Sequence, residues 1–228
     1  MLWSEETVRA AIRNRAGERV FFLSREDTLT PSARDYLRRE KIRILPAEEA
    51  KQAEFCLENG AVFQEKPEHF THLRGNTLVA KTHPVIAFRG AMDTLQAQIL
   101  LAQTAVPDKA RKDLEEILEL ARQIIGREVM EEPLEARTLC GLTQDELRRH
   151  SHFPQEYYGQ PHFMPAYSDG EGLLRLNAAR CAARAAELAA AAAFTDRSGN
   201  CTRVDILKAL NRMSSMLYIL MIRQKAGR

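Results

Sequence analysis

Apolar residues recur at helical spacing through the latter two thirds of the chain and predict a set of packed helices. Residues 172–194 are dominated by alanine and leucine, the strongest helix formers, and predict one uninterrupted helix. Apolar stripes predict further helices over residues 91–103 and 108–126, and a last helix after Thr202. Helices joined by modest connections have to bury these stripes on one another, so we expect an antiparallel bundle.

Capping signals indicate where these helices begin and end. Thr143 and Glu146 have capping-box spacing for a short helix that ends before Pro154. Asp108 is placed to cap the helix that Gly126 ends. The last helix has its own candidate caps, Thr202 and Asp205.

The segment from His150 to Gly172 breaks the helical pattern. It holds three histidines, five aromatic residues, three prolines and three glycines, which is too rich in rings for an ordinary polar loop. Long ordered loops of this type often cover or form a site. We therefore expect this segment to border the functional site.

The start of the chain carries a different pattern, which predicts a small α/β extension. Ser4 can cap a first helix that Gly17 ends, and Thr30 can cap a second. A short strand is predicted after each helix, over residues 19–23 and 42–45.

Periodicity is lost between Lys51 and Arg74, and this loss marks a domain boundary. We predict an N-terminal extension over residues 1–70 and a helical domain over residues 71–228. The arginines of the extension alternate with acids and lack an aromatic or glycine-rich binding pattern, which disfavours nucleic acid. We expect an interaction or docking module instead.

Composition and charge narrow the class of protein. The chain has 228 residues, of which 45% are hydrophobic, enough for one sizeable core. Lys plus Arg number 33 against 31 acids, so the formal charge of +2 gives no general attraction to nucleic acid or membrane. The charged first residues and the lack of a long apolar run indicate a soluble, cytoplasmic protein. Four cysteines without paired spacing indicate reduced thiols and no zinc site.

Charged residues form one stripe on the alanine-rich helix. The stripe holds Asn177, Arg180, Arg184 and Glu187, which follow one another at steps of three or four. It is either an ordinary solvated face, whose ion pairs contribute little, or a face toward the bundle interior or a subunit boundary.

Three segments together resemble the ATP-dependent corrinoid adenosyltransferases, most closely the ethanolamine-utilisation type. They are VAKTHPVIAFRGAMDTLQA, FMPAYSDGEGLLRLNAARCAARAAEL and LNRMSSMLYILMIR, and they occur in the order that the family has. The matching residues include Asp93, Arg180, Arg184, Glu187, Asn211, Arg212 and Ser214. Ala185 and Ser215 depart from the pattern, because many relatives have an arginine and an acid there.

The resemblance implies a mainly α fold, an antiparallel five-helix-type bundle with the small α/β extension. It also implies a homo-oligomer, with a trimer favoured, that holds ATP between subunits and cobalamin beside it. In this chemistry Co(I) attacks the ribose 5′ carbon and expels triphosphate. The adenosylcobalamin product would serve a lyase of a bacterial microcompartment, in the cytoplasm or within that compartment.

The resemblance also assigns roles to residues of the nucleotide site. Arg180 and Arg184 would grip the polyphosphate as forked donors, and Lys81 would add a point charge. Asp93 would orient Arg180 as a partner. Glu187 would bind the ribose or a magnesium ion, and Asn211 would contact ATP. Thr71 sits where relatives have a phosphate loop, although the residues up to Asn76 are equally well a generic turn.

The corrinoid half of the site needs an apolar platform that favours reduction of cob(II)alamin by displacing its lower ligand. The candidates are Phe88, Phe153, Tyr157 and Phe163, for which ordinary core packing is the alternative. His150, His152 and His162 could bind a metal, but without thiols or helical spacing we expect polar loop histidines and no resident metal. The rival functions are a noncatalytic bundle that binds ATP or a corrinoid, and a purely structural assembly module.

Overall fold

The computed structural model describes residues 1–15, 17–51 and 55–227. Contacts between residues divide the chain into two compact units, Met1–His83 and Pro84–Arg228. The division falls after the predicted boundary at residue 70, because residues 77 and 78 pair with residues 56 and 57, and residues 70–74 pair in turn with residues 77–80. Among the described helices, none combines the length and the apolar character needed to cross a membrane.

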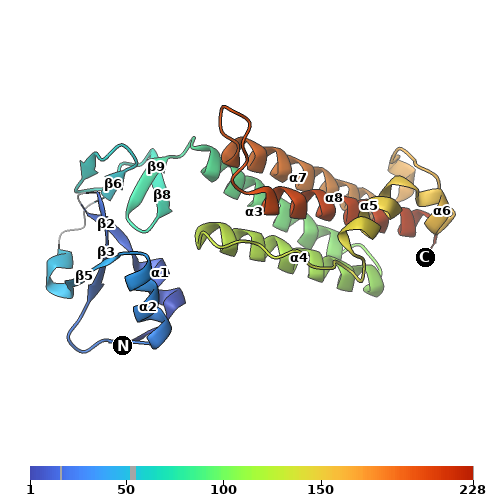
Figure 1. The fold of residues 1–228 in the computed structure, drawn as a ribbon. Coiled ribbons are helices and arrows are strands. Elements are labelled where there is room, and N and C mark those ends of the chain that lie inside the picture. The colour runs from blue at the N-terminus through green and yellow to red at the C-terminus, as the bar shows by residue number, and fades with distance from the viewer. Residues whose placement is uncertain (16, 52–54, 228) are drawn as a thin grey trace. The chain divides into compact units, whose positions relative to one another are not determined.

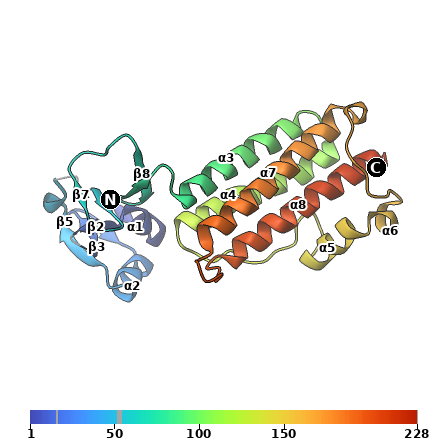
Figure 2. The ribbon, with the colours of Figure 1, turned by 90° about the horizontal axis from the view of Figure 1, so that it is seen from above.

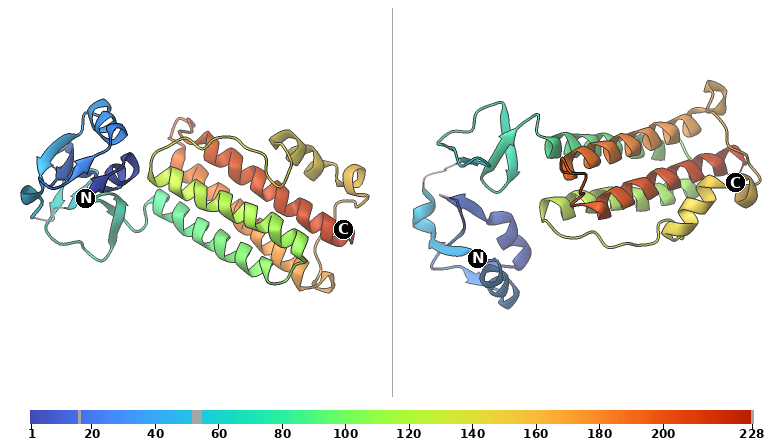
Figure 3. Two further views of the ribbon diagram at one scale, coloured as in Figure 1. Left: turned by 90° about the horizontal axis from the view of Figure 1, so that it is seen from below. Right: turned by 45° about the horizontal axis from the view of Figure 1, so that its top comes forward.

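The second unit is an antiparallel bundle, as the periodicity predicts (Figures 1 and 2). Its helices are α3 (Pro84–Gln103), α4 (Asp108–Val129), α5 (Gln144–His152), α6 (Pro154–Tyr158), α7 (Glu171–Phe194) and α8 (Val204–Lys225). Helix α7 packs along both α3 and α8, α4 packs along α3, and the short helices α5 and α6 lie on α8. The four long helices run side by side in every view (Figure 3).

Small residues on α7 allow this close packing. Its buried face is mostly alanine, namely Ala179, Ala182, Ala183, Ala186 and Ala190. At the start of the helix, a Cβ on Gly172 would lie 2.5 Å from the carbonyl oxygen of Ala105 and 2.5 Å from Nε2 of Gln224. Only glycine fits that approach, so the N-terminal end of α7 is fixed between the end of α3 and the end of α8.

A buried ion pair joins α3 to α4. Arg89 Nε and Nη2 donate to the two carboxylate oxygens of Glu128 over 2.8 and 3.2 Å. Glu128 is 0% exposed. Removing the arginine would leave this carboxylate buried without its partner and would lower the free energy of unfolding by about 3–5 kcal/mol. The pair therefore fixes the register of these two helices.

The first unit contains small sheets and two helices. Strands β2 (Arg13–Arg15), β3 (Glu18–Leu23) and β5 (Arg43–Pro46) form one sheet, and β1 (Leu2–Trp3) pairs with β4 (Thr28–Leu29). Helices α1 (Glu5–Ala11) and α2 (Pro31–Arg39) contribute to the core, and a 3-10 turn follows at Ala47–Lys51. A second sheet has the order β7 (Val62–Phe63), β6 (Phe55–Leu57), β9 (Thr77–Ala80) and β8 (Phe70–Arg74).

Asn76 fastens this second sheet to β2. Its Oδ1 accepts the backbone N–H of Asn14 over 2.5 Å, and its Nδ2 donates to the Asn14 carbonyl over 2.7 Å. Asn14 Nδ2 in turn donates to Thr77 Oγ1 over 2.6 Å. Asn76 is only 3% exposed. The turn before β9 therefore has a structural task, which the sequence alone did not distinguish from phosphate binding.

The predicted caps at Thr30 and Thr143 are confirmed. Thr30 accepts the Ala33 N–H at the start of α2, and Thr143 with Glu146 forms a complete capping box on α5. The predicted end of the first helix is wrong, because α1 ends at Ala11 and the chain then becomes strand β2.

Other predicted boundaries in the bundle are also wrong. Helix α3 begins at Pro84 rather than at residue 91, and α4 continues past Gly126 to Val129. Pro107, not Asp108, is the N-cap residue of α4. The N-cap residue of α8 is Arg203, not Thr202 or Asp205, and the Asp205 carboxylate accepts the distant Leu134 N–H over 2.8 Å. The segment between α5 and α7 is not wholly irregular, since it contains α6 and a 3-10 turn at Tyr167–Asp169.

Gly75 offers a test of the junction between β2 and the second sheet. Its φ is +52°, and an added Cβ would lie 2.1 Å from the carbonyl oxygen of Ile12. We expect Gly75→Ala to lower the free energy of unfolding of the first unit by about 3 kcal/mol, from backbone strain and overpacking together. Trp3, the only tryptophan, packs edge-on to Phe21 and reports this unfolding by fluorescence in urea.

Gly60→Ala is the matched control, because Gly60 also has a positive φ, +86°, but has open space around it. Gly60→Ala should lower the free energy of unfolding by only about 1 kcal/mol, because it adds the strain of a left-handed backbone without a steric clash. Equal losses in the two variants would show that the contact with Ile12 does not matter.

Candidate functional site

A polar cavity of about 270 Å³ lies between α7, α8 and the end of α5. It is lined by Ser151, His152, His162, Arg180, Arg184, Asn211, Ser214, Ser215 and Tyr218. Three of the predicted site residues, Arg180, Arg184 and Asn211, are thus brought together. The regular spacing of residues on α7 and α8 brings these three side chains together.

Helical periodicity explains why these side chains meet. Arg180 and Arg184 lie four residues apart on α7, so they share one face. Asn211, Ser215 and Tyr218 follow at steps of four and three on α8 and share another. Because α7 packs against α8, the two polar stripes line the same cavity.

Arg180 and Arg184 of α7 keep their charge available. Arg180 Nε and Nη2 donate to Oδ1 of Asn177, over 3.3 and 3.2 Å, and the guanidinium carbon lies 5.8 Å from the ring centre of Tyr218. Arg184 is exposed. In the described part of the chain, neither arginine pairs with a carboxylate. Two such guanidiniums can bind a polyanion through charge-assisted, forked hydrogen bonds.

Glu187 and Asn211 form a fixed pair beside the arginines. Asn211 Nδ2 donates to Glu187 Oε1 over 3.0 Å, while Asn211 Oδ1 accepts Nη2 of Arg212 over 2.6 Å. Burial, followed by repulsion from Arg148, lowers the pKa of Arg212. The Glu187 carboxylate on one side and the Arg212 guanidinium on the other therefore orient the Asn211 amide.

The remaining residues predicted for the nucleotide site are not gathered at this cavity. Asp93 is exposed on α3 and forms no ion pair with Arg180, whose donors are turned to Asn177. Lys81 Nζ pairs with Glu68 over 2.8 Å, and this contact lowers the pKa of the Glu68 carboxyl. Thr71 lies within β8, opposite Val79 of β9. Both Lys81 and Thr71 belong to the first unit.

Of the four residues predicted to contact the corrinoid, one is buried in the core and three belong to the aromatic segment between α5 and α7. Phe88 is 0% exposed and packs edge-on against Phe194, so it offers no surface to a ligand and is better explained by core packing. Phe153 is 59% exposed at the junction of α5 and α6. Tyr157 stacks on His150 with ring centres 3.8 Å apart, and Phe163 lies 6.5 Å from the Tyr218 ring.

Tyr218 and Ser151 line the cavity but were missed by sequence reasoning, and Tyr218 is the larger of the two. Tyr218 lies seven residues after Asn211, on the same stripe of α8, and that spacing could have identified it. His152 and His162, weighed above as metal ligands, line the cavity as separate groups. Across the described ranges, no three His, Cys, Asp or Glu side chains gather in a way that could hold a metal ion.

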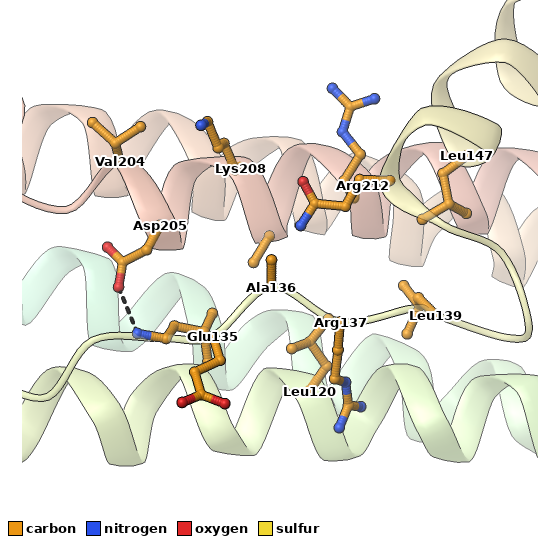
Figure 4. Close-up of a pocket in the computed structure, with 13 residues that line it drawn as sticks. Leu120, Glu135, Ala136, Arg137, Leu139, Leu147, Val204, Asp205, Lys208 and Arg212 are labelled. Carbon is orange, nitrogen blue, oxygen red and sulfur yellow. Dashed lines mark hydrogen bonds between the residues drawn. The ribbon is translucent and has the colours of Figure 1, made fainter.

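A second cavity, of about 310 Å³, lies between α4, α8 and the segment before α5 (Figure 4). Leucines 120, 139 and 147 supply apolar lining. Two of its charged groups hold the segment in place: Asp205 accepts the Leu134 N–H, and Arg137 Nη2 donates to the Glu116 carbonyl over 3.3 Å. The polar groups therefore do not converge, and the first cavity is the better candidate.

Comparison with known proteins identifies relatives. The model of the cobalamin adenosyltransferase family matches residues 61–224. The corrinoid adenosyltransferase EutT of Salmonella typhimurium is 37% identical over 158 residues, and the match spans 69% of this chain but only 59% of that protein. EutT of Escherichia coli K12 is 31% identical over 226 residues, spanning 88% of this chain and 84% of that protein.

A solved structure has a similar fold. It is a single-residue variant of the PduO-type ATP:corrinoid adenosyltransferase from Lactobacillus reuteri, complexed with cobalamin and ATP. The TM-score is 0.50 at 20% sequence identity, over 70% of this chain and 90% of that one. At 20% identity this similarity is evidence for the fold alone. The shared fold agrees with the helical bundle described above.

The anion-binding capacity of the cavity can be measured directly. Arg184→Ala should weaken the binding of inorganic triphosphate by about 10- to 100-fold, because it removes charge-assisted hydrogen bonds that contribute about 1.5–3 kcal/mol. Isothermal titration calorimetry gives the dissociation constants. The control is Arg175→Ala, since Arg175 is also on α7 but pairs with Glu171. If both variants bound triphosphate equally well, the cavity would not be the anion site.

Proposed function

Since this chain belongs to the cobalamin adenosyltransferase family, we propose that it transfers the 5′-deoxyadenosyl group of ATP to cob(I)alamin and releases triphosphate. The observation that supports this most strongly is the coincidence of the family match with the polar cavity. The match runs from before α3 to the last turn of α8, and the cavity holds Arg180, Arg184 and Asn211. ATP and cobalamin are then the two substrates.

The reaction requires stabilisation of a strongly anionic leaving group. A bond forms between Co(I) and the ribose 5′ carbon while the bond from that carbon to the triphosphate oxygen breaks. Preorganised donors directed at developing charge are the usual source of such stabilisation. Arg180 and Arg184 meet this requirement, because the described residues offer no carboxylate that neutralises them.

Glu187 and Asn211 are proposed to hold the nucleoside end of ATP or its metal ion. Glu187 fits a magnesium ion, since carboxylate oxygens are among the ligands that this ion prefers and Asn211 already orients one of them. Magnesium would accompany the phosphates and reduce their mutual repulsion. Asn211 would direct its amide group at ATP.

The aromatic segment is proposed as the corrinoid platform. Phe153 has the exposed surface that such a platform needs, and Phe163 lies near the cavity-lining Tyr218. Tyr157 is placed by its stack on His150. A large corrin ring would gain both apolar contact and a hindered lower face from these rings.

A homo-oligomer, with a trimer favoured, is part of the proposal. Leu188 is 73% exposed on α7, and Cys181 and Ala185 lie exposed on the same stripe. An apolar stripe of this kind suits contact with a second copy. Asp93 is exposed on α3 and could complete a site shared between copies. Thr71 and Lys81 are kept as further ATP contacts on the family resemblance alone.

The first unit is proposed to dock the enzyme to a partner, such as a lyase or shell protein of a bacterial microcompartment. The relatives named EutT support a link to ethanolamine utilisation. Deletion of residues 1–50 would test docking through co-purification with shell proteins.

A noncatalytic relative is the alternative function, and Ser215 favours it. Serine brings no carboxylate to the position where many relatives have an acid. The Ser215 hydroxyl instead donates to the Asn211 carbonyl over 3.2 Å. Ala185 likewise leaves one guanidinium fewer on α7. Such a protein would bind ATP or a corrinoid, or serve assembly, without chemistry.

Anaerobic mixing with ATP, magnesium and chemically reduced cobalamin distinguishes these functions. The proposal predicts the alkylcobalamin spectrum together with one triphosphate released per cobalamin. Binding of cobalamin without triphosphate release would identify a noncatalytic carrier. Binding of neither substrate would identify a structural module.

Arg180→Ala should lower kcat/KM for ATP by about a hundredfold, the usual effect of removing one donor from a developing negative charge. Arg180→Lys should fall between this variant and the wild type, because it keeps the charge but loses the fork. Initial rates at limiting ATP give the comparison. Unchanged rates in Arg180→Ala would refute the polyphosphate role.

A further inference from the structure

His162 joins the aromatic segment to the bundle through both ring nitrogens. Nδ1 lies 2.8 Å from the hydroxyl of Tyr218, and Nε2 lies 3.1 Å from the carbonyl oxygen of His152. A carbonyl only accepts, so Nε2 carries a hydrogen. In the neutral ring Nδ1 is then an acceptor, and the Tyr218 hydroxyl donates to it.

Tyr218 contacts the segment with its hydroxyl and Arg180 with its ring. The Phe163 ring lies 6.5 Å from the Tyr218 ring, centre to centre. The Tyr218 ring lies nearly parallel to that of His162, at 10°, with centres 5.8 Å apart. The guanidinium carbon of Arg180 lies 5.8 Å from the same ring, which is within cation–π distance.

We propose that Tyr218 is a positioning residue that couples the aromatic segment to the triphosphate-binding arginine. Its hydroxyl holds His162, and thereby the adjoining Phe163, while its ring holds Arg180. This inference rests on the proposed function, in which Phe163 serves the corrinoid and Arg180 serves the triphosphate. The two contacts use different parts of one side chain, so substitution can separate them.

Other contacts keep the segment folded when Tyr218 is changed. Lys225 at the end of α8 pairs with Asp169 and lies 5.6 Å from the Phe163 ring centre. Arg223 lies 5.5 Å over the Tyr158 ring. Helix α8 thus anchors the segment at several points, and loss of the Tyr218 hydroxyl should shift the local geometry without unfolding the segment.

Tyr218→Phe and Tyr218→Leu separate the two contacts in steady-state kinetics. Tyr218→Phe removes the hydroxyl and keeps the ring, so KM for cob(I)alamin should rise about fivefold while KM for ATP stays unchanged. Tyr218→Leu removes the ring as well, so KM for ATP should rise too. A double variant with His162→Ala should lose no more than the larger single loss, because both changes remove the same bond.

Tyr167→Phe is the matched control, since Tyr167 belongs to the same segment and is 92% exposed. It should leave both KM values unchanged. The proposal is overturned if Tyr218→Phe raises KM for ATP as much as KM for cob(I)alamin, or if it behaves like the control.

Binding of inorganic triphosphate separates failure of this inference from failure of the proposed function. If the wild type showed no turnover, the adenosyltransferase function would fall, but calorimetry could still test the contact with Arg180. Tyr218→Leu should then weaken triphosphate binding severalfold, and Tyr218→Phe should leave it unchanged. Equal binding by both variants and the wild type would overturn the coupling.

Discussion

The close approach of α7 to α3 and α8 is the constraint on which the rest of the bundle depends. Alanines on the buried face of α7 let the neighbouring backbones come near, and Gly172 fixes the first turn, where any Cβ would collide with the Ala105 carbonyl. The long polar side chains of α7 therefore have to leave on other sides of the helix. Arg180 and Arg184 do so toward the stripe of α8 that lines the same cavity.

The molecule uses arginine in two physically different ways. Arg89 is matched by the buried carboxylate of Glu128, and that pair holds α3 against α4. Arg180 instead meets the neutral amide of Asn177 and the face of Tyr218. These neutral partners orient the guanidinium but leave its charge uncompensated. A group held in this way is prepared for an anionic ligand, whereas Arg89 is already satisfied within the fold.

Local signals in the sequence predicted much of the fold, because neighbouring residues decide them. The caps at Thr30 and Thr143 and the alanine-rich helix are of this kind. Asp205 was misjudged, and the task of Asn76 was left open, because their partners lie far away in the sequence: the backbone of Leu134 for one, and that of Asn14 for the other. No local pattern reveals such contacts.

The candidate site was predictable to the extent that it follows helical spacing. Spacing placed Arg180 and Arg184 on one stripe of α7, whereas Asn211 was assigned by the family resemblance. The same spacing on α8 leads from Asn211 to Tyr218, but only the path of the aromatic segment shows what Tyr218 contacts. Phe88 carried a corrinoid role by resemblance, yet its complete burial against Phe194 explains it as core.

The most direct test of the central claim is a crystal structure of the protein with ATP bound. The account predicts triphosphate oxygens within hydrogen-bond distance of both Arg180 and Arg184, in the cavity that Asn211 also lines. Triphosphate bound elsewhere, with these two guanidiniums left free of it, would contradict the account.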